Sequence, residues 1–297
     1  MHALLRELLG SGPVVTDGAW GTQLQAEGLS LGECPDVWNI SNPQKVFTVA
    51  HSYVDAGSQV ILTNTFGANG VRLAEQGIAE KAQEINRRGV EISREASGGR
   101  AKVFASIGPS GKLLLTGDTS AKELESAFAE QAEALAQAGA HGLVIETMSD
   151  LDEALLAVRA AQATGLPVVA SMVFDSGKAR DRTLMGQAPE QIATALAAAG
   201  ADVIGANCGQ GIAGFIHICK RLRSATDRPI WIKPNAGLPS VVEGKAIYSV
   251  TAAEFSSFVP ALIEAGASFI GGCCGTSPEF ISAMVSKLRP RSGIPDG

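Results

Sequence analysis

Eight short apolar runs alternate along the chain with longer segments of helical periodicity, and this alternation constrains the fold more than any other feature. The runs are PVVTDG, VILTNTF, KVFASIGP, GLVIETM, PVVASMVF, ADVIGANC, PIWIKPNA and FIGGCCGT. Strands that alternate with helices form parallel sheets, and eight evenly recurring strand–helix pairs favour closure into a barrel over an open doubly wound sheet. We therefore expect an α/β protein with the (β/α)8 TIM-barrel architecture.

A weak internal repeat supports this fold and a single domain. AGSQVI, AGAHGLVI, AGADVI and AGASFI each end a helix with Ala-Gly and begin the second, fourth, sixth and eighth strands. A Rossmann fold is the architectural rival, but G-x-G-x-x-G follows none of the early strands. Because neither a linker nor a shift in composition divides the chain, we expect one barrel over 1–297. Residues 1–12 should form a short amphipathic helix and residues 290–297 a flexible tail.

Composition narrows the class of partner and the compartment. The chain has 297 residues, 45% of them hydrophobic, and a net charge of -6. It lacks a block of lysine or arginine, which argues against nucleic acid and anionic membranes as partners and favours small molecules. The sequence contains neither a run of ~20 apolar residues nor a signal-peptide pattern at its start. Five cysteines are too few for a disulfide framework in a chain this long, so we expect a cytoplasmic protein with reduced thiols.

Polar residues gather where the predicted strands end. The carboxyl ends of barrel strands meet at one face, and the loops there carry catalytic residues. We therefore expect a functional site built from Asp17, Asn64, Thr65, Glu146, Thr147, Asn207, Cys208, Asn235, Cys273 and Cys274.

Three of these residues are thiols, which the barrel would bring to one rim. Cys208, Cys273 and Cys274 suit a tetrahedral Zn²⁺ ion with one position left for an exogenous ligand, as in catalytic rather than structural sites. A vicinal disulfide or an iron–sulfur cluster is the alternative, although the adjacent pair resembles neither C-x-x-C nor the usual cluster spacings. Cys34 and Cys219 are expected to be small core residues.

Other residue types have weaker assignments. The glycines around the thiol pair, Gly271, Gly272 and Gly275, would let the backbone bend so that consecutive thiols face the site. We expect His51, His141 and His217 to lie on helices or a helix end, away from the strand ends, and not to bind metal.

Two carboxylates and several amides complete the predicted site. Asp17 and Glu146 could act as an acid/base dyad or bind an ammonium group. A helix cap for Asp17 and an ion pair with arginine for Glu146 are the structural alternatives. The side chains of Asn64, Thr65, Asn207 and Asn235 are expected to brace the site by hydrogen bonds.

Eight motifs together resemble the homocysteine S-methyltransferase family. They are DGAWGTQLQ, TNTFGAN, IGPSGKLL, IETMSD, TLMGQ, GANCGQG, KPNAGLP and GGCCGTSPEF, and the resemblance extends from about residue 13 to residue 288. It implies a zinc-dependent barrel that methylates the thiol of homocysteine to give methionine. Cys208, Cys273 and Cys274 would then be the zinc ligands and the catalytic centre.

The resemblance also implies how the acceptor is held. Asp17 and Glu146 match the positions that hold the ammonium group of homocysteine. The backbone at Gly18 and Ala19 matches the place that meets its carboxylate.

The methyl donor stays open at this point. DGAWGTQLQ, TNTFGAN and IGPSGKLL are most similar to the homocysteine module of cobalamin-dependent methionine synthase. The sequence ends one helix after Gly275, from which we expect neither folate- and cobalamin-binding modules nor the C-terminal arm of betaine-dependent relatives. The donor would be a methyl-corrinoid on a separate protein, S-methylmethionine, betaine or another sulfonium compound. Alternatives are a different thiol acceptor, a non-catalytic zinc- or corrinoid-docking barrel, and a hydrolase, which the thiol-rich ligand set disfavours.

Overall fold

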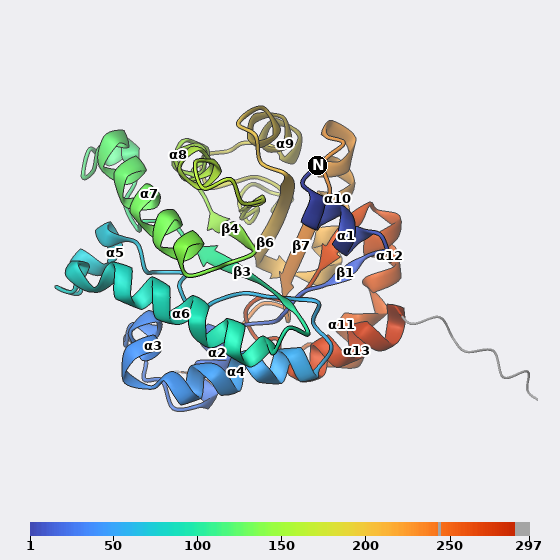
Figure 1. Ribbon diagram of the computed structural model, residues 1–297. Helices are drawn as coiled ribbons and strands as arrows, with labels where there is room; N and C mark the ends of the chain where they lie inside the picture. Colours follow the sequence, from blue (N-terminus) through green and yellow to red (C-terminus); the bar gives the residue numbers. More distant parts are fainter. Residues whose placement is uncertain (243–244, 289–297) are drawn as a thin grey trace, which may run out of the picture.

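Eight parallel strands form the centre of the computed structural model, which describes residues 1–242 and 245–288 (Figure 1). They follow the order β1-β10-β7-β6-β5-β4-β3-β2. Their bounds are β1 Val14–Val15, β2 Val60–Ile61, β3 Lys102–Ile107, β4 Gly142–Met148, β5 Val168–Met172, β6 Val203–Gly211, β7 Ile230–Asn235 and β10 Ala267–Ile270. A parallel bridge between Thr16 and Val60 joins β1 to β2. The predicted (β/α)8 barrel is therefore confirmed, and the tail predicted for 290–297 lies outside the described residues.

Helices surround the strands in chain order (Figure 1). Those that follow β1 to β3 are α2 Gly21–Ala26, α3 Trp38–Ser41, α4 Pro43–Asp55, α5 Gly70–Ala74, α6 Ala82–Ser97 and α7 Ala121–Gln137. Those that follow β4 to β10 are α8 Leu151–Gln162, α9 Pro189–Ala198, α10 Ile212–Ala225, α11 Ala252–Ser257, α12 Val259–Glu264 and α13 Pro278–Leu288. The last helix, α13, contacts both α4 and β1, which completes the outer ring.

The Ala-Gly repeat marks the point where a helix gives way to a strand. Gly57, Gly139, Gly200 and Gly266 have φ angles of 100°, 91°, 97° and 103°. A residue with a Cβ atom rarely adopts these φ angles. Glycine therefore ends each helix at little cost in conformational energy and lets the chain turn into the next strand.

Apolar residues from all eight strands fill the interior of the barrel, with two of them, Val60 and Leu62, from β2 and the residue after it. Val14, Val60, Leu62, Phe104, Val144, Val169, Val203, Trp231 and Phe269 form this cluster. Leu5, from α1 Ala3–Leu9, is fully buried against the same cluster. Helix α1 therefore covers the amino-terminal end of the barrel with its apolar face, and the opposite, carboxyl end is left for function.

One element was not predicted from the sequence. After β7 the chain forms an antiparallel hairpin of β8 Ser240–Val242 and β9 Lys245–Ile247, in which Ser240 pairs with Ile247. Strands of three residues are too short to show a clear period of two. Within the described residues, no helix is long and apolar enough to cross a bilayer.

Candidate active site

A polar layer lies directly above the apolar cluster in the barrel. Side chains two residues apart on a strand point to the same face, so the residues that follow Phe104, Val144, Val169 and Trp231 by two also face inward. These residues are Ser106, Glu146, Ser171 and Lys233, and all four are buried. The strands thus place two charged residues and two hydroxyl groups inside the barrel, next to its carboxyl face.

The three predicted thiols do meet at this face. Cys208 lies in β6, while Cys273 and Cys274 lie in the turn between β10 and α13. The three Sγ atoms are within 4.8 Å of one another, and those of Cys208 and Cys274 are 4.0 Å apart. Two sulfurs that each lie ~2.3 Å from a tetrahedral zinc ion are separated by roughly 3.8 Å. The cluster can therefore hold a metal ion after small side-chain shifts.

The backbone around the thiols has unusual conformations. Cys208 has a φ angle of 61°, and the pairing register of β6 with β7 shifts between Asn207 and Gly211. A Cβ atom at Gly271 would collide with Thr16 Oγ1 and would lie 2.6 Å from the carbonyl oxygen of Asp17. The absence of a side chain at Gly271 thus lets the ends of β10 and β1 approach each other closely. This adds to the bend that the sequence predicts at the glycines around the thiol pair.

The thiols share a single negative charge. Hydrogen bonds from Cys273 and then Cys274 lower the pKa of Cys208 to about 3. The hydrogen bond to Cys208 raises the pKa of Cys273 well above its ordinary value and that of Cys274 to about 11. One thiolate with two thiol donors is the arrangement that protein groups alone support. A bound cation would supply the positive charge that lets the other two ionise, so the donor chemistry fits a metal ion that prefers sulfur.

The other cysteines and the histidines lie apart from this cluster. Among the described residues, the group of potential metal ligands within reach of one another consists of Cys208, Cys273 and Cys274. Cys219 is fully buried, and burial raises the pKa of its thiol to about 12, as expected for a core residue. Cys34 is only partly buried and lines the outer part of the same cavity.

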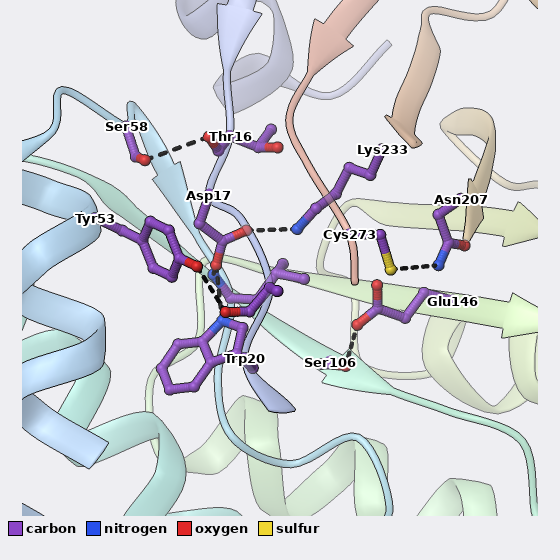
Figure 2. Close-up of polar contacts among 12 residues, drawn as sticks. Thr16, Asp17, Trp20, Tyr53, Ser58, Ser106, Glu146, Asn207, Lys233 and Cys273 are labelled. Atoms are coloured by element: carbon purple, nitrogen blue, oxygen red, sulfur yellow. Dashed lines mark hydrogen bonds and ion pairs between the residues drawn. The ribbon is translucent and has the colours of Figure 1, made fainter. Parts of the chain in front are cut away.

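Asp17 is buried beneath the site and is bonded to the protein itself (Figure 2). Its Oδ1 atom lies 2.5 Å from Nζ of Lys233. Its Oδ2 atom accepts hydrogen bonds from the indole of Trp20 at 2.8 Å and from the backbone N–H of Leu62 at 2.7 Å. Three donors from the chain therefore already surround the carboxylate that the family resemblance assigns to an ammonium group.

Glu146 is placed differently, at the wall of the cavity. It is 8% exposed, and its Oε1 atom accepts a hydrogen bond from Ser106 Oγ at 2.5 Å (Figure 2). Burial raises the pKa of Glu146, although the positive charge of Lys233 opposes the shift. A carboxylate at a cavity wall can, when ionised, attract a cationic group.

The predicted amides and hydroxyl hold the strand ends together. Asn207 Oδ1 accepts from Thr147 N–H at 2.9 Å and from Ser171 Oγ at 2.7 Å, and Asn207 Nδ2 faces Cys273 Sγ at 4.0 Å (Figure 2). Asn235 lies near Cys208 and helps to lower the pKa of its thiol.

The remaining pair of predicted braces lies at the end of β2. Asn64 Nδ2 donates to the carbonyl of Pro35 at 2.7 Å, and Thr65 Oγ1 donates to the carbonyl of Ser106 at 2.7 Å. These bonds fix the loop after β2 against the loop after β1 and against the end of β3.

Gly18 and Ala19 line the cavity where β1 leads into α2. The N–H of Ala19 donates to Thr276 Oγ1 at 3.1 Å, and its carbonyl accepts from the hydroxyl of Tyr53 at 2.6 Å. The backbone of Ala19 is therefore engaged within the protein, although the sequence resemblance assigns it to the carboxylate of the acceptor.

The cavity at the carboxyl face has a volume of about 730 Å³. Its inner end is lined by the three thiols, Glu146 and Lys233, and its outer part by residues such as Cys34 and Arg72. Lys233, Trp20 and Tyr248 also line this cavity, and they were not predicted from the sequence. For Lys233 a signal exists, because it follows Trp231 by two residues on β7.

A barrel whose carboxyl face carries three convergent thiols beside a buried carboxylate belongs to the class of barrels that can hold a metal ion at a cavity. Comparison with known proteins specifies the class. The family profile for homocysteine S-methyltransferase matches residues 14–288, so the chain belongs to the homocysteine S-methyltransferase family, a family of S-methyltransferase enzymes. The resemblance inferred from the motifs is confirmed.

Individual relatives agree with this assignment. The chain is 31% identical to methionine synthase of Mycobacterium tuberculosis over 98% of its own length and 26% of that protein. It is 32% identical to methionine synthase of Mycobacterium leprae over 96% of its length and 25% of that protein. The chain thus spans about a quarter of the length of these curated relatives.

A solved structure agrees in fold. The metallated form of the homocysteine methyltransferase MmuM from Escherichia coli superposes with a TM-score of 0.79 at 24% identity. The match covers 95% of this chain and 99% of that chain, so the two proteins share the barrel over nearly their whole lengths.

Proposed function

We propose that this barrel transfers a methyl group to the thiol of homocysteine, giving methionine, with Zn²⁺ held by Cys208, Cys273 and Cys274. The observation that carries the proposal is the convergence of these three thiols within 4.8 Å at the inner end of a cavity that Glu146 also lines. Family membership over residues 14–288 supports the same reaction.

The chemistry that zinc supplies at such a site is deprotonation of the acceptor thiol, which at an ordinary pKa of ~8.5 is only a few per cent thiolate at neutral pH. The protein's own residues bind and orient the acceptor and position the cysteines. Glu146 binds the ammonium group of the acceptor and orients its thiol toward the cysteines. Asn207 and Asn235 hold the cysteine side chains in place, so that little reorganisation accompanies substrate binding.

The surroundings of the site favour the same chemistry. Tyr248 lines the cavity beside the thiols, and burial raises the pKa of its hydroxyl to about 12. Tyr248 therefore remains neutral and does not compete as an anion. Unpaired thiols of this kind persist in a reducing compartment, which supports a cytoplasmic location.

The cavity leaves room for the donor above the acceptor. We propose a donor whose methyl group enters from the open mouth, either as a small sulfonium or betaine molecule or on a separate methyl-corrinoid protein.

The decisive experiment incubates zinc-loaded protein with homocysteine and, in separate reactions, methylcobalamin, S-methylmethionine, betaine and a dimethylsulfonium compound. Methionine formed with one donor identifies the reaction and its donor class. Absence of methionine with all four donors, while zinc is bound at one ion per chain, would reject homocysteine methylation by the isolated barrel. The C208A variant serves as the matched control, because it keeps the cavity and removes one ligand.

A further inference from the structure

A buried lysine stands at the inner end of the cavity, where the family resemblance does not predict one. Lys233 is 2% exposed, lies on β7 one inward position above Trp231, and lines the cavity. Burial of an ammonium group is costly unless a partner of opposite charge compensates it. Asp17, which is fully buried, is that partner, at 2.5 Å.

The hydrogen-bonding capacity of Lys233 is only partly used. A lysine ammonium group has three N–H donors. Within the described part of the chain, Asp17 Oδ1 is the acceptor that hydrogen-bonds to Nζ. Asp17 does not belong to the lining of the cavity formed by the described residues, whereas Lys233 does. The remaining donors of Lys233 are therefore available to a molecule bound in the cavity.

The two charged side chains that line this end of the cavity have opposite signs. Asp17 is neutralised by Lys233 and also accepts hydrogen bonds from Trp20 and Leu62, so it offers little to a substrate ammonium group. Glu146 lies at the wall and, among side chains described here, is hydrogen-bonded to the neutral Ser106 rather than to a positively charged group. An α-amino acid carries the complementary pair, an ammonium group for Glu146 and a carboxylate for Lys233.

We propose that Lys233 binds the carboxylate of the acceptor and thereby determines the specificity of this barrel for a thiol that carries one. The inference rests on the proposed function and extends it. The backbone N–H of Ala19, which the resemblance assigns to this carboxylate, is engaged with Thr276 Oγ1. Lys233 supplies the positive charge that this backbone segment lacks.

The test measures dissociation constants by titration calorimetry on zinc-loaded protein, with homocysteine and two truncated analogues as ligands. 3-Aminopropane-1-thiol lacks the carboxylate and 4-mercaptobutyrate lacks the ammonium group. We expect the wild-type protein to bind 3-aminopropane-1-thiol about 10- to 150-fold more weakly than homocysteine, the range for a charge-assisted hydrogen bond. In Lys233→Met the two constants should approach each other, mainly because homocysteine binding is lost.

A Lys233→Met protein that keeps the wild-type preference for homocysteine overturns the inference. The inference is also overturned if Lys233→Met binds homocysteine and 3-aminopropane-1-thiol more tightly than the wild-type protein but with the same ratio of dissociation constants. Lys233 would then only neutralise Asp17. If the single variant does not fold, Asp17→Asn/Lys233→Met removes both buried charges and is compared with Asp17→Asn, where Lys233 remains.

The outcome separates this inference from the proposed function. Discrimination by carboxylate without methionine formation from any donor would reject the function and keep the role of Lys233. Methionine formation without discrimination by carboxylate would support the proposed function and reject the role of Lys233.

Discussion

Replacement of Glu146 by glutamine tests the assignment of the acceptor site most directly. The change is nearly isosteric, and the amide oxygen can still accept the hydrogen bond that Ser106 donates to Oε1 at 2.5 Å. What disappears is one negative charge that faces the ammonium group of the acceptor. A hydrogen bond between charged groups contributes about 1.5–3 kcal/mol net, which corresponds to about 10- to 150-fold in affinity.

Zinc should be far less affected. Glu146 does not belong to the three-thiol cluster, and it acts on Cys208 only through its charge. We therefore expect Glu146→Gln to bind one zinc ion per chain, as measured by elemental analysis, while calorimetry shows the 10- to 150-fold loss in homocysteine affinity. Equal loss of zinc and homocysteine would refute the reasoning and make Glu146 a structural residue of the metal site. Ser106→Ala is the matched control, because it removes the donor and keeps the carboxylate.

The same substitution has a defined effect on stability and on pH dependence. Because burial raises the pKa of Glu146, the folded protein binds more protons than the unfolded chain in the window above the ordinary glutamate pKa of 4.5. The contribution of this group to stability therefore falls as pH rises through that window. Glu146→Gln should melt at the same or a higher temperature than the wild-type protein at pH 7, and homocysteine affinity should lose the acid-side decrease caused by protonation of Glu146.

Three further substitutions test the metal centre and the barrel. Cys273→Ala should abolish stoichiometric zinc and methionine formation while the circular dichroism spectrum is retained; activity in the metal-free variant would contradict the mechanism. Gly271→Ala should lower zinc content or thermal stability, because the new Cβ meets Thr16 Oγ1 and the carbonyl of Asp17, and a variant identical to wild type in both would contradict the packing. Leu5→Ala should cost about 2–5 kcal/mol in urea unfolding, since Leu5 is fully buried under the barrel. An unchanged midpoint would mean that α1 does not seal the barrel end.

Much of the barrel could be predicted from the sequence because its signals are local. The Ala-Gly turns before the second, fourth, sixth and eighth strands need positive φ at glycine, and the structure shows this at Gly57, Gly139, Gly200 and Gly266. Strand-end positions also follow from the fold once the strands are known. For this reason Cys208, Cys273 and Cys274 could be placed at one rim although 65 residues separate the first two.

Partnerships between side chains were harder to predict. The ion pair of Asp17 with Lys233 joins residues 216 positions apart, and its geometry depends on how far each strand extends and on the rotation of each side chain. The positive φ angle of Cys208 was equally hidden, because a non-glycine residue gives no sign of it in the sequence. The role of Lys233 could have been suspected from strand alternation, since Trp231 and Lys233 share a face of β7.

Helix α1 closes the amino-terminal end of the barrel in the described part of the chain, so the cavity opens at the carboxyl face. Because Leu5 packs against the apolar cluster inside the strands, we expect small molecules to enter and leave at the carboxyl face. In the proposed reaction, an acceptor thiol beside the cysteines would lie deeper in the cavity than a methyl donor at its mouth. If the proposed reaction is correct, we expect the acceptor to bind before the donor and the product to leave after it, which product-inhibition kinetics would test.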